Sequence, residues 1–470
     1  MDFESRPETL SWRDPDGFIV NLQGRILRAV VTQKAEQIRA LLGEAWMKRL
    51  ISEGDVPATQ EISQLPQLAA YGNDYVWLEH AAVAFPCFPH EITAFQLYDS
   101  ASLTLKIAIR ALEHGWILKD ASAWNVLHSH GRPVFIDLLS FERDARSSTW
   151  MAYGQFSRHF LLPLLLYRKL GMIPAEVFLT NRDGIAPERA YPLLGAGRLI
   201  SWTSLELVLM PKWLTRAGGH LIAERRERKP AAMDADLARD LTLRTLHRLR
   251  RMLDRLRPHT SARESVWADY EDVRPHYSEV DLASKKDFVR EHLGSSLTVL
   301  DLGCNAGEFS QLAAEGGREV VAADADHSAV SRFYERVRGQ KARITPLMLN
   351  ISRPTPAVGW ANRETPSFLE RAVGKFDCIL ALGLVHHLLV SDRITLPLLA
   401  QLLDELAPKS VIIEWIDPTD SRFAQVAGLN ADLYRSLDTG QFEACLGRKF
   451  TLAAKLPLQC KTRVMYLWRR

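Results

Sequence analysis

Alternating apolar and polar residues predict strands near the start of the chain. Residues 17–31 (GFIVNLQGRILRAVV) alternate on either side of Gln23 and Gly24. This pattern predicts a hairpin of two strands joined by a tight turn at that pair. Helical spacing follows as far as Gly171, and it includes the apolar run Phe160–Tyr167 (FLLPLLLY). That run is far shorter than the ~20 residues that span a bilayer, so it predicts a buried helix or an interfacial patch.

A second pattern, of period 3.6, appears in residues 233–257. Leucines recur at helical spacing and arginines occupy the other face, which predicts one amphipathic helix. Pro258 ends it, because proline cannot continue a helix. The leucines are Leu246, Leu249, Leu253 and Leu256.

Beyond Leu297, strand-like and helix-like segments alternate as far as Arg470. Such alternation predicts a mainly parallel sheet covered by helices on both faces. We therefore expect an α+β domain over residues 1–230, a basic helical connector over 231–262, and a doubly wound, Rossmann-like α/β domain over 263–470.

Composition narrows the class of protein and its compartment. The 470 residues exceed the ~150 of a typical domain about threefold, and the net charge is only +3. The segment Trp213–Pro258 alone holds 12 basic against 6 acidic residues, so the basicity is local. The N-terminus lacks a secretory signal pattern, and the five cysteines form no C-x-x-C pair. We expect a cytoplasmic protein without a transmembrane segment; oligomeric state leaves no trace in the sequence.

A glycine-containing loop follows the first strand of the C-terminal region. The strand 297–302 runs into Gly303 and ends its loop at Gly307, before a helix. Glycines let backbone amides approach a ligand closely, and a helix N-terminus offers free N–H groups. The next strand, REVVAAD, ends at Asp324, whose carboxylate suits the two hydroxyls of a ribose. The order of these features predicts a nucleotide-type cofactor site.

The loop sequence D-x-G-C-N-x-G departs from the G-x-G-x-x-G of dinucleotide-binding proteins. The segments VLDLGCNAGEFS, VVAADAD, FDCILALGLVHHL and SVIIEWIDPTD resemble the successive strand-end motifs of class I S-adenosylmethionine-dependent methyltransferases. The resemblance covers roughly Leu297–Arg470 and implies S-adenosyl-L-methionine as cofactor. It implies that the methionine end is held by Asp301, Gly303, Asn305 and Gly307, the ribose by Asp324 and the adenine by Asn350.

Candidates for catalysis follow the fourth and fifth strands. His386 and His387 lie at the carboxyl edge of the sheet, where doubly wound folds place ligands. Either is a candidate general base, with Glu414 as a further catalytic candidate. These residues and Asp417 form a conceivable metal set, but no supporting ligand pattern accompanies them, and we expect no metal. The alternative is that one histidine only packs.

A separate motif lies in WILKDASAWNVLHSHGRPVFIDLLSFE. Asp120, Asn125 and Asp137 resemble the catalytic loop and the metal-binding aspartate of protein-kinase-like phosphotransferases. Leu118 and Lys119 replace the usual His and Arg, and no G-x-G-x-x-G or V-A-I-K motif is present. The resemblance implies a kinase-like N-terminal region, whether or not phosphotransfer is retained. Alternatively, the three polar residues only cap the loop.

Taken along most of the chain, these motifs resemble one family, the bacterial class I methyltransferases that include the NoeA-type nodulation proteins. This implies methyl transfer to an oxygen or nitrogen acceptor, with a saccharide or lipid-linked saccharide in host-specific nodulation as one possibility. RNA is an alternative acceptor, because the arginine-rich helix offers a basic surface. Two further alternatives are a bifunctional kinase-methyltransferase and a non-catalytic scaffold that binds the cofactor.

Overall fold

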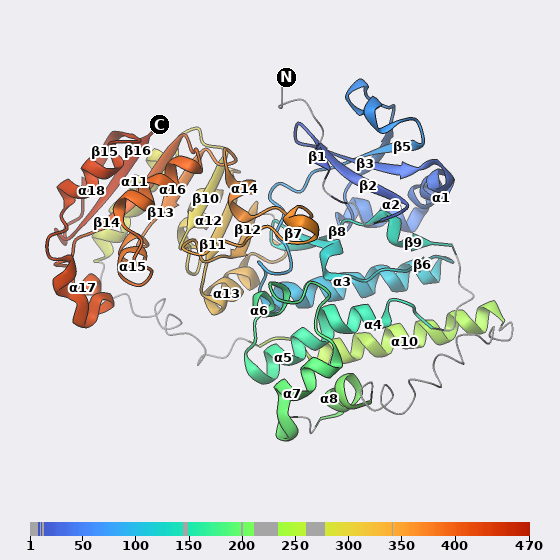
Figure 1. Cartoon of the computed structure of the whole chain (residues 1–470). Coiled ribbons are helices and arrows are strands. Elements are labelled where there is room, and N and C mark those ends of the chain that lie inside the picture. Colours follow the sequence, from blue (N-terminus) through green and yellow to red (C-terminus); the bar gives the residue numbers. More distant parts are fainter. Residues whose placement is uncertain are drawn as a thin grey trace. The chain divides into compact units, whose positions relative to one another are not determined.

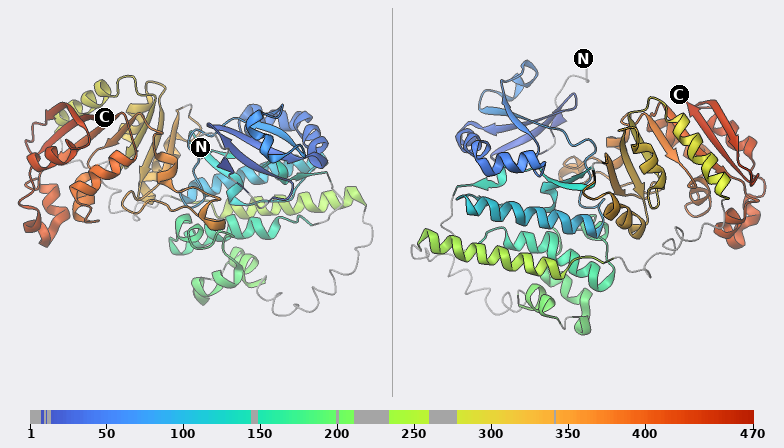
Figure 2. Two further views of the ribbon diagram at one scale, coloured as in Figure 1. Left: turned by 45° about the horizontal axis from the view of Figure 1, so that its top comes forward. Right: turned by 180° about the vertical axis from the view of Figure 1, so that it is seen from behind.

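The chain folds into two compact units. The computed structural model describes residues 8–9, 11, 14–143, 149–198, 201–210, 234–259, 278–340 and 342–470. Unit 1 comprises Met1–His128, Arg132–His259 and Gly359–Thr365. Unit 2 comprises Ser129–Gly131, Thr260–Val358 and Pro366–Arg470. Figure 1 and Figure 2 show the elements of each unit.

Unit 1 begins with a five-stranded antiparallel sheet in the order β1-β2-β3-β5-β4. The predicted hairpin is confirmed, because β2 and β3 flank Gln23 and Gly24, whose φ angles of 53° and 83° are those of a tight hairpin turn. A small apolar core lies on one face of the sheet and includes Leu27 and Trp77. The elements are β1 (Glu8–Thr9), β2 (Gly17–Leu22), β3 (Arg25–Val31), α1 (Thr32–Gly43), α2 (Ala45–Glu53), β4 (Thr59–Ile62) and β5 (Tyr75–His80).

The centre of unit 1 is the helix α3 (Ala94–Glu113), in which most side chains are buried. Its first turn is closed by a capping box between Thr93 and Gln96. Two short ribbons follow, β6 (Ile117–Leu118) with β9 (Phe141–Glu142), and β7 (Val126–Ser129) with β8 (Arg132–Phe135). The α-helices that the structure describes between β9 and the basic helix are α4 (Tyr153–Phe156), α5 (Leu162–Leu170), α6 (Pro174–Phe178), α7 (Pro187–Arg198) and α8 (Trp202–Ser204).

The predicted amphipathic helix is α10 (Ala235–Arg255), and it belongs to unit 1. Leu246, Leu249 and Leu253 of this helix are buried at the expected spacing, as is Leu256 directly after its end, and the helix packs against α3. Arg248 and Arg251 are exposed on the opposite face, which explains the periodicity of the sequence. The stretches 231–233 and 260–262, at the two ends of the expected connector, lie outside the described residues.

Unit 2 is built on a seven-stranded sheet in the order β12-β11-β10-β13-β14-β16-β15. The first five strands of this order are parallel, whereas β16 and β15 pair antiparallel. The order reverses at β10, which has β11 on one side and β13 on the other. The strands are β10 (Thr298–Leu302), β11 (Glu319–Asp324), β12 (Ile344–Met348), β13 (Cys378–Ala381), β14 (Ser410–Ile416), β15 (Thr451–Pro457) and β16 (Arg463–Arg469).

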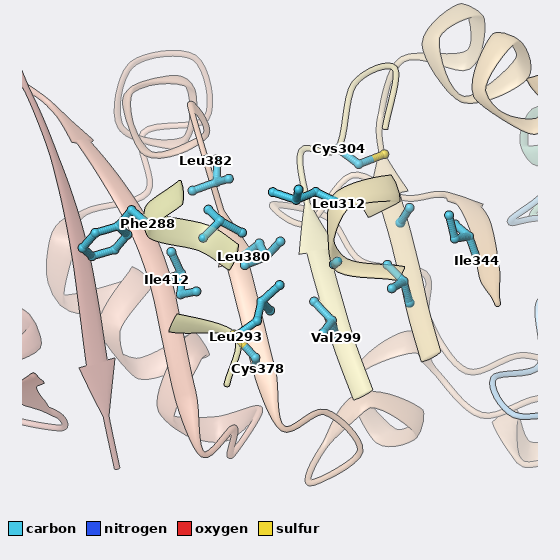
Figure 3. Packing of buried hydrophobic residues seen from close by; sticks show 14 of the residues in the cluster. Phe288, Leu293, Val299, Cys304, Leu312, Ile344, Cys378, Leu380, Leu382 and Ile412 are labelled. Atoms are coloured by element: carbon cyan, nitrogen blue, oxygen red, sulfur yellow. The ribbon is translucent and has the colours of Figure 1, made fainter. Parts of the chain in front are cut away.

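Helices cover both faces of this sheet, as the alternation in the sequence predicts. Val299 belongs to the core on one face of the sheet, whereas its neighbour Leu300 points to the other face. Both side chains are fully buried, so both faces are covered. Figure 3 shows part of the core to which α11, α12 and α13 contribute. The helices are α11 (Glu279–His292), α12 (Glu308–Ala314), α13 (His327–Val337), α14 (Phe368–Ala372), α15 (Val385–Val390), α16 (Leu396–Glu405), α17 (Ser421–Ala427) and α18 (Thr439–Leu446). Within the described part of the chain, no helix is both long and apolar enough to cross a bilayer.

Candidate functional site

A cavity of about 460 Å³ opens at the carboxyl ends of the parallel strands of unit 2. Segments that follow β10, β11, β12 and β13 line it, together with residues of α11, α15 and α17. Open α/β sheets place ligands at this edge, where the strand order reverses. The volume lies within the ~300–1,000 Å³ range of small-molecule sites.

The loop after β10 takes the conformation that its glycines allow. Gly303, Asn305 and Gly307 have φ angles of 73°, 48° and 81°, which favour glycine or asparagine. The amide of Gly303 donates to the carbonyl of Ala323 over 2.9 Å and so ties the loop to the end of β11. A Cβ at Gly307 would lie 2.2 Å from the ring of Phe333, so this position requires glycine.

Asp301 is a buried carboxylate at the floor of the cavity. Its Oδ2 accepts a hydrogen bond of 2.6 Å from the hydroxyl of Ser310 in α12. Burial raises the pKa of Asp301 to about 6, and the charge of Asp324 acts in the same direction. A buried carboxylate with so little compensation is suited to a cationic ligand group, which would favour its ionised form.

Asp324 connects the loop to the next strand. Its Oδ2 accepts from the amide of Asn305, and its Oδ1 from the amide of Asp326, each over 2.8 Å. Burial raises the pKa of Asp324 in spite of these hydrogen bonds. A carboxylate has about four acceptor positions, so both oxygens retain capacity for the hydroxyls of a ribose.

The structure brings together the residues that the sequence proposes for the cofactor. Asn350 follows β12 and lines the cavity, where its Oδ1 accepts from the amide and the hydroxyl of Ser352. Gly307 does not line the cavity, and its backbone conformation helps to form the end of the loop. The remaining proposed residues that line it are Asp301, Gly303, Asn305 and Asp324.

Both candidate histidines lie in α15 and line the cavity. Their ring centroids are 4.0 Å apart. His386 is 3% exposed, and neither of its ring nitrogens has a hydrogen-bond partner among the described residues. Burial lowers the pKa of His386 to about 2 and that of His387 to about 4, so both rings are neutral near pH 7.

Glu414 has a different environment from the one expected of a catalytic group. It is fully buried in β14, and its Oε2 accepts from the ammonium of Lys285 over 2.7 Å. Lys285, from α11, lines the cavity. Lys285 was not recognised in the sequence, because it and the adjacent Lys286 differ only in the face of the helix that they occupy.

Two arginines also line the cavity without having been recognised in the sequence. Arg463, at the start of β16, makes a buried two-point ion pair with Asp420, over 2.9 and 3.1 Å. Burial alone would raise the pKa of Asp420, but hydrogen bonds from Arg463 and Thr462 hold it at about 2. Arg422, in α17, donates to the side chain of Gln425 over 2.5 Å. The available signal for Arg463 in the sequence was an arginine at the start of the largely apolar strand RVMYLWR.

Among the described residues, no group of three or more His, Cys, Asp or Glu side chains is arranged to hold a metal ion. This applies to the histidines, Glu414 and Asp417, which the sequence raised as a conceivable set. Asp417 instead accepts from the amide and hydroxyl of Thr419 in a turn after β14.

The polar motif of unit 1 forms a separate cluster. The Nδ2 of Asn125 lies 3.5 Å from Asp137, and Ser140 donates a short hydrogen bond to the same carboxylate. Arg28, buried in β3, forms an ion pair of 3.2 Å with Asp137. Asp120 accepts from the amide of Ser122 over 2.9 Å, and burial together with the charge of Asp137 raises its pKa. Part of this motif therefore caps its own loop.

Comparisons with known proteins show what the chain is similar to. Residues 273–437 match a family described as a methyltransferase domain. The chain is 26% identical to the nodulation protein NoeA of Rhizobium meliloti (strain 1021), covering 98% of this chain and 95% of that protein.

Solved structures with a related fold match only part of the chain. The N-methyltransferase NodS of Bradyrhizobium japonicum WM9, in complex with S-adenosyl-L-homocysteine, is 14% identical. That match covers 42% of this chain and 90% of NodS, with a TM-score of 0.31. The bifunctional kinase-methyltransferase WbdD is 22% identical over 40% of this chain and 38% of its own, with a TM-score of 0.28.

The matched residues include β10, the loop that follows it and Asp324, and also α15 and α17. Residues 273–437 of unit 2 thus match a methyltransferase domain, which supports S-adenosylmethionine as the cofactor, in a chain that resembles the nodulation protein NoeA along nearly its whole length.

Proposed function

We propose that this protein transfers a methyl group to an oxygen or nitrogen atom of a small-molecule acceptor, a saccharide or lipid-linked saccharide that serves in host-specific nodulation. The acceptor class is supported by the similarity to NoeA over 98% of the chain, which includes unit 1 as well as the methyltransferase domain. The single observation that carries methyl transfer is the cavity. Residues suited to the cofactor line it, and so does His386, whose buried ring nitrogens have no hydrogen-bond partner among the described residues.

The residues present suit S-adenosylmethionine. Asp301 and the loop from Gly303 to Asn305 would face the methionine part, Asp324 the ribose and Asn350 the adenine. When bound, the cofactor supplies an electrophilic methyl group on a positively charged sulfur. The protein's task is then to exclude water and to hold the acceptor atom in line with that methyl group.

His386 is proposed to orient the acceptor. Its ring is neutral near pH 7 because burial holds its pKa at about 2, so a ring nitrogen is free to accept an O–H or N–H of the acceptor. When bound, the cofactor would supply the methyl group, and its sulfur would keep the electron pair of the broken bond. His386 would hold the acceptor atom through a hydrogen bond, and the acceptor's proton would leave to water. His387, 4.0 Å away, supports the ring of His386.

Glu414 is proposed as a positioning residue. Its ion pair with Lys285 fixes a cation at the wall of the cavity, close to Gly383. A glutamate without its own access to the acceptor is poorly placed for proton transfer. Its role is then to hold Lys285 rather than to take part in the chemistry.

Unit 1 is proposed as the kinase-like, acceptor-binding part of the protein. The observation that favours binding over phosphotransfer is the ion pair of 3.2 Å between Arg28 and Asp137. A carboxylate already neutralised by a buried arginine is a weak ligand for Mg²⁺, which the kinase reaction requires.

The proposal is tested by calorimetric titration with S-adenosylmethionine and S-adenosylhomocysteine. Wild-type protein should bind both, and Asp324→Asn should weaken both at least tenfold, because two loop amides and the ribose share that carboxylate. Glu315→Gln, at an exposed site on α12's C-terminal side, is the matched control and should bind normally. Failure of the wild-type protein to bind either compound contradicts the proposal. Transfer of labelled methyl to a bacterial glycolipid extract then tests the acceptor class.

A further inference from the structure

The outward face of α10 in unit 1 carries leucines at one end and arginines at the other. Six exposed side chains form this stripe, because their spacing of three or four residues repeats the turn of the helix. The stripe extends about 27 Å along the helix axis. Its members are Leu237, Leu241, Arg244, Arg248, Arg251 and Arg255.

The arginine end of the stripe is only partly neutralised. Arg244 and Arg248 form ion pairs with acids, over 2.8 and 2.6 Å. Arg251 and Arg255 have no ion pair with any residue that the structure describes. Three further exposed arginines without such a pair lie at the same end, and one of them, from α5, donates a short hydrogen bond to the carbonyl of Arg255. They are Arg168, Arg250 and Arg257.

The acids near this end are too few to balance the arginines. Asp254, within the segment, accepts a hydrogen bond of 3.1 Å from the hydroxyl of Tyr98. Asp240 and Glu206 are the partners of the two paired arginines. Seven arginines therefore stand against three acids, seven minus three, which leaves a net charge of +4. Such a surface attracts an anionic partner.

Large apolar side chains accompany the arginines. The two leucines of the stripe are exposed, although the helix buries four other leucines beneath them or at its end. The segment η6 (Leu205–Leu209) runs beside the stripe, because its Glu206 pairs with Arg248. Trp202 and Met210, four residues before and after Glu206, are 77% and 48% exposed. The partner of this surface must therefore suit apolar groups as well as cations.

We propose that the stripe of α10, together with Trp202 and Met210, docks unit 1 on the surface of a bilayer that contains anionic phospholipids. The arginines bind headgroup phosphates, whose oxygens match the donors of a guanidinium group. The leucines and Trp202 enter the boundary between headgroups and acyl chains, where such side chains are favoured. RNA phosphates would engage the arginines but leave the leucines against water. The proposal concerns unit 1 alone and does not depend on methyl transfer.

The test is flotation of the full-length protein with vesicles of two compositions, phosphatidylcholine alone and equal parts of phosphatidylcholine and phosphatidylglycerol. We expect the wild-type protein to float only with the anionic vesicles, and less so as salt is raised. The double variant Arg251→Gln and Arg255→Gln should bind them roughly thirtyfold more weakly, because each arginine near such a surface contributes about fivefold. Arg251→Lys with Arg255→Lys should retain binding, since the charge is kept.

A second pair of variants separates a bilayer from RNA. Leu237→Ser with Leu241→Ser should weaken vesicle binding at least fivefold, because apolar burial is lost while every charge remains. The matched control is Arg39→Gln with Arg49→Gln, which removes two exposed arginines from α1 and α2 and should float as the wild-type protein does.

Three outcomes overturn the proposal. It is wrong if the wild-type protein floats with neither composition, or equally with both. It is also wrong if the double glutamine variant floats as the wild-type protein does. If a single-stranded RNA oligonucleotide binds the wild-type protein and the leucine variant equally, and the leucine variant still floats normally, the arginines serve a polyanion and the bilayer is refuted.

Discussion

The buried carboxylate of Asp301 should make the affinity for S-adenosylmethionine depend on pH. Its pKa of about 6 in the free protein means that the carboxylate is mostly ionised at pH 7 and mostly protonated at pH 5. A cationic group of the cofactor prefers the ionised form. Binding should therefore weaken as the pH falls through 6.

The size of the effect follows from the fraction ionised. With a pKa of about 6, that fraction falls from roughly 0.9 at pH 7 to roughly 0.1 at pH 5, so Kd should rise about tenfold, or about 1.4 kcal/mol. Neither His386 nor His387 changes charge in this window, since their pKa values are about 2 and about 4. The amino group of the cofactor, with an ordinary pKa of about 8, also stays protonated.

The same carboxylate affects stability in the opposite sense. The folded-state pKa is raised above the unfolded value of 3.8, so the native state favours the protonated acid. This contribution to the free energy of unfolding is fully present below pH 3.8 and is lost as the pH rises through 6. Asp301→Asn removes the buried charge while keeping an acceptor for Ser310. The free variant should therefore be more stable at pH 7, by up to about 3 kcal/mol, yet bind the cofactor more weakly.

Calorimetric titrations at pH 5, 6 and 7, paired with thermal unfolding of the free protein, measure both effects. Glu315→Gln, which removes an exposed carboxylate, should reproduce the wild-type slope. Asp324 also has a raised pKa, so a residual slope in Asp301→Asn reports that second acid. The reasoning is refuted if Kd in the wild-type protein is the same at pH 5 and pH 7, or if Asp301→Asn keeps the full wild-type slope.

Two further predictions concern the packing around the cavity. Gly307→Ala should destabilise the protein by about 2–4 kcal/mol in denaturant unfolding, because a Cβ would lie 2.2 Å from the ring of Phe333. Gly317→Ala has a similar φ of 74° but open space around it, so it should lose only about 1 kcal/mol, and equal losses would contradict the ring contact. Lys285→Met should lose about 3–5 kcal/mol, because it leaves Glu414 buried without its cation. The double change to Met at Lys285 and Glu414 should recover most of that loss, and an equally unstable double variant would show that the ion pair is not the cause.

The cofactor end of the cavity was predictable because its determinants are local. Gly303 and Asn305 have backbone angles that few other residues adopt, and they directly follow a buried strand. Asp324 ends the next strand, and parallel pairing of β10 with β11 brings its carboxylate to the loop. Backbone chemistry and strand order therefore give the positions of these side chains without knowledge of the rest of the fold.

The partners of the buried charges were not predictable in this way. Lys285 and Glu414 are 129 residues apart, and Arg28 and Asp137 are 109 apart. Each pair forms only when distant elements pack, and a single sequence holds no signal for which lysine or arginine meets which acid. Glu414 was accordingly a catalytic candidate whose partner could not be read from the sequence, and in the structure its carboxylate accepts a hydrogen bond from Lys285.

This difference explains why the acceptor is harder to infer than the cofactor. The residues proposed for the cofactor lie within Asp301–Asn350, on three adjacent strands and the loops that follow them. Residues of α15 and α17 and the first residue of β16 line the rest of the cavity, and these segments are far apart in the sequence. A substitution in α17 would change the residues there without altering the loop after β10. A chain with this architecture is thus free to change its acceptor while keeping its cofactor.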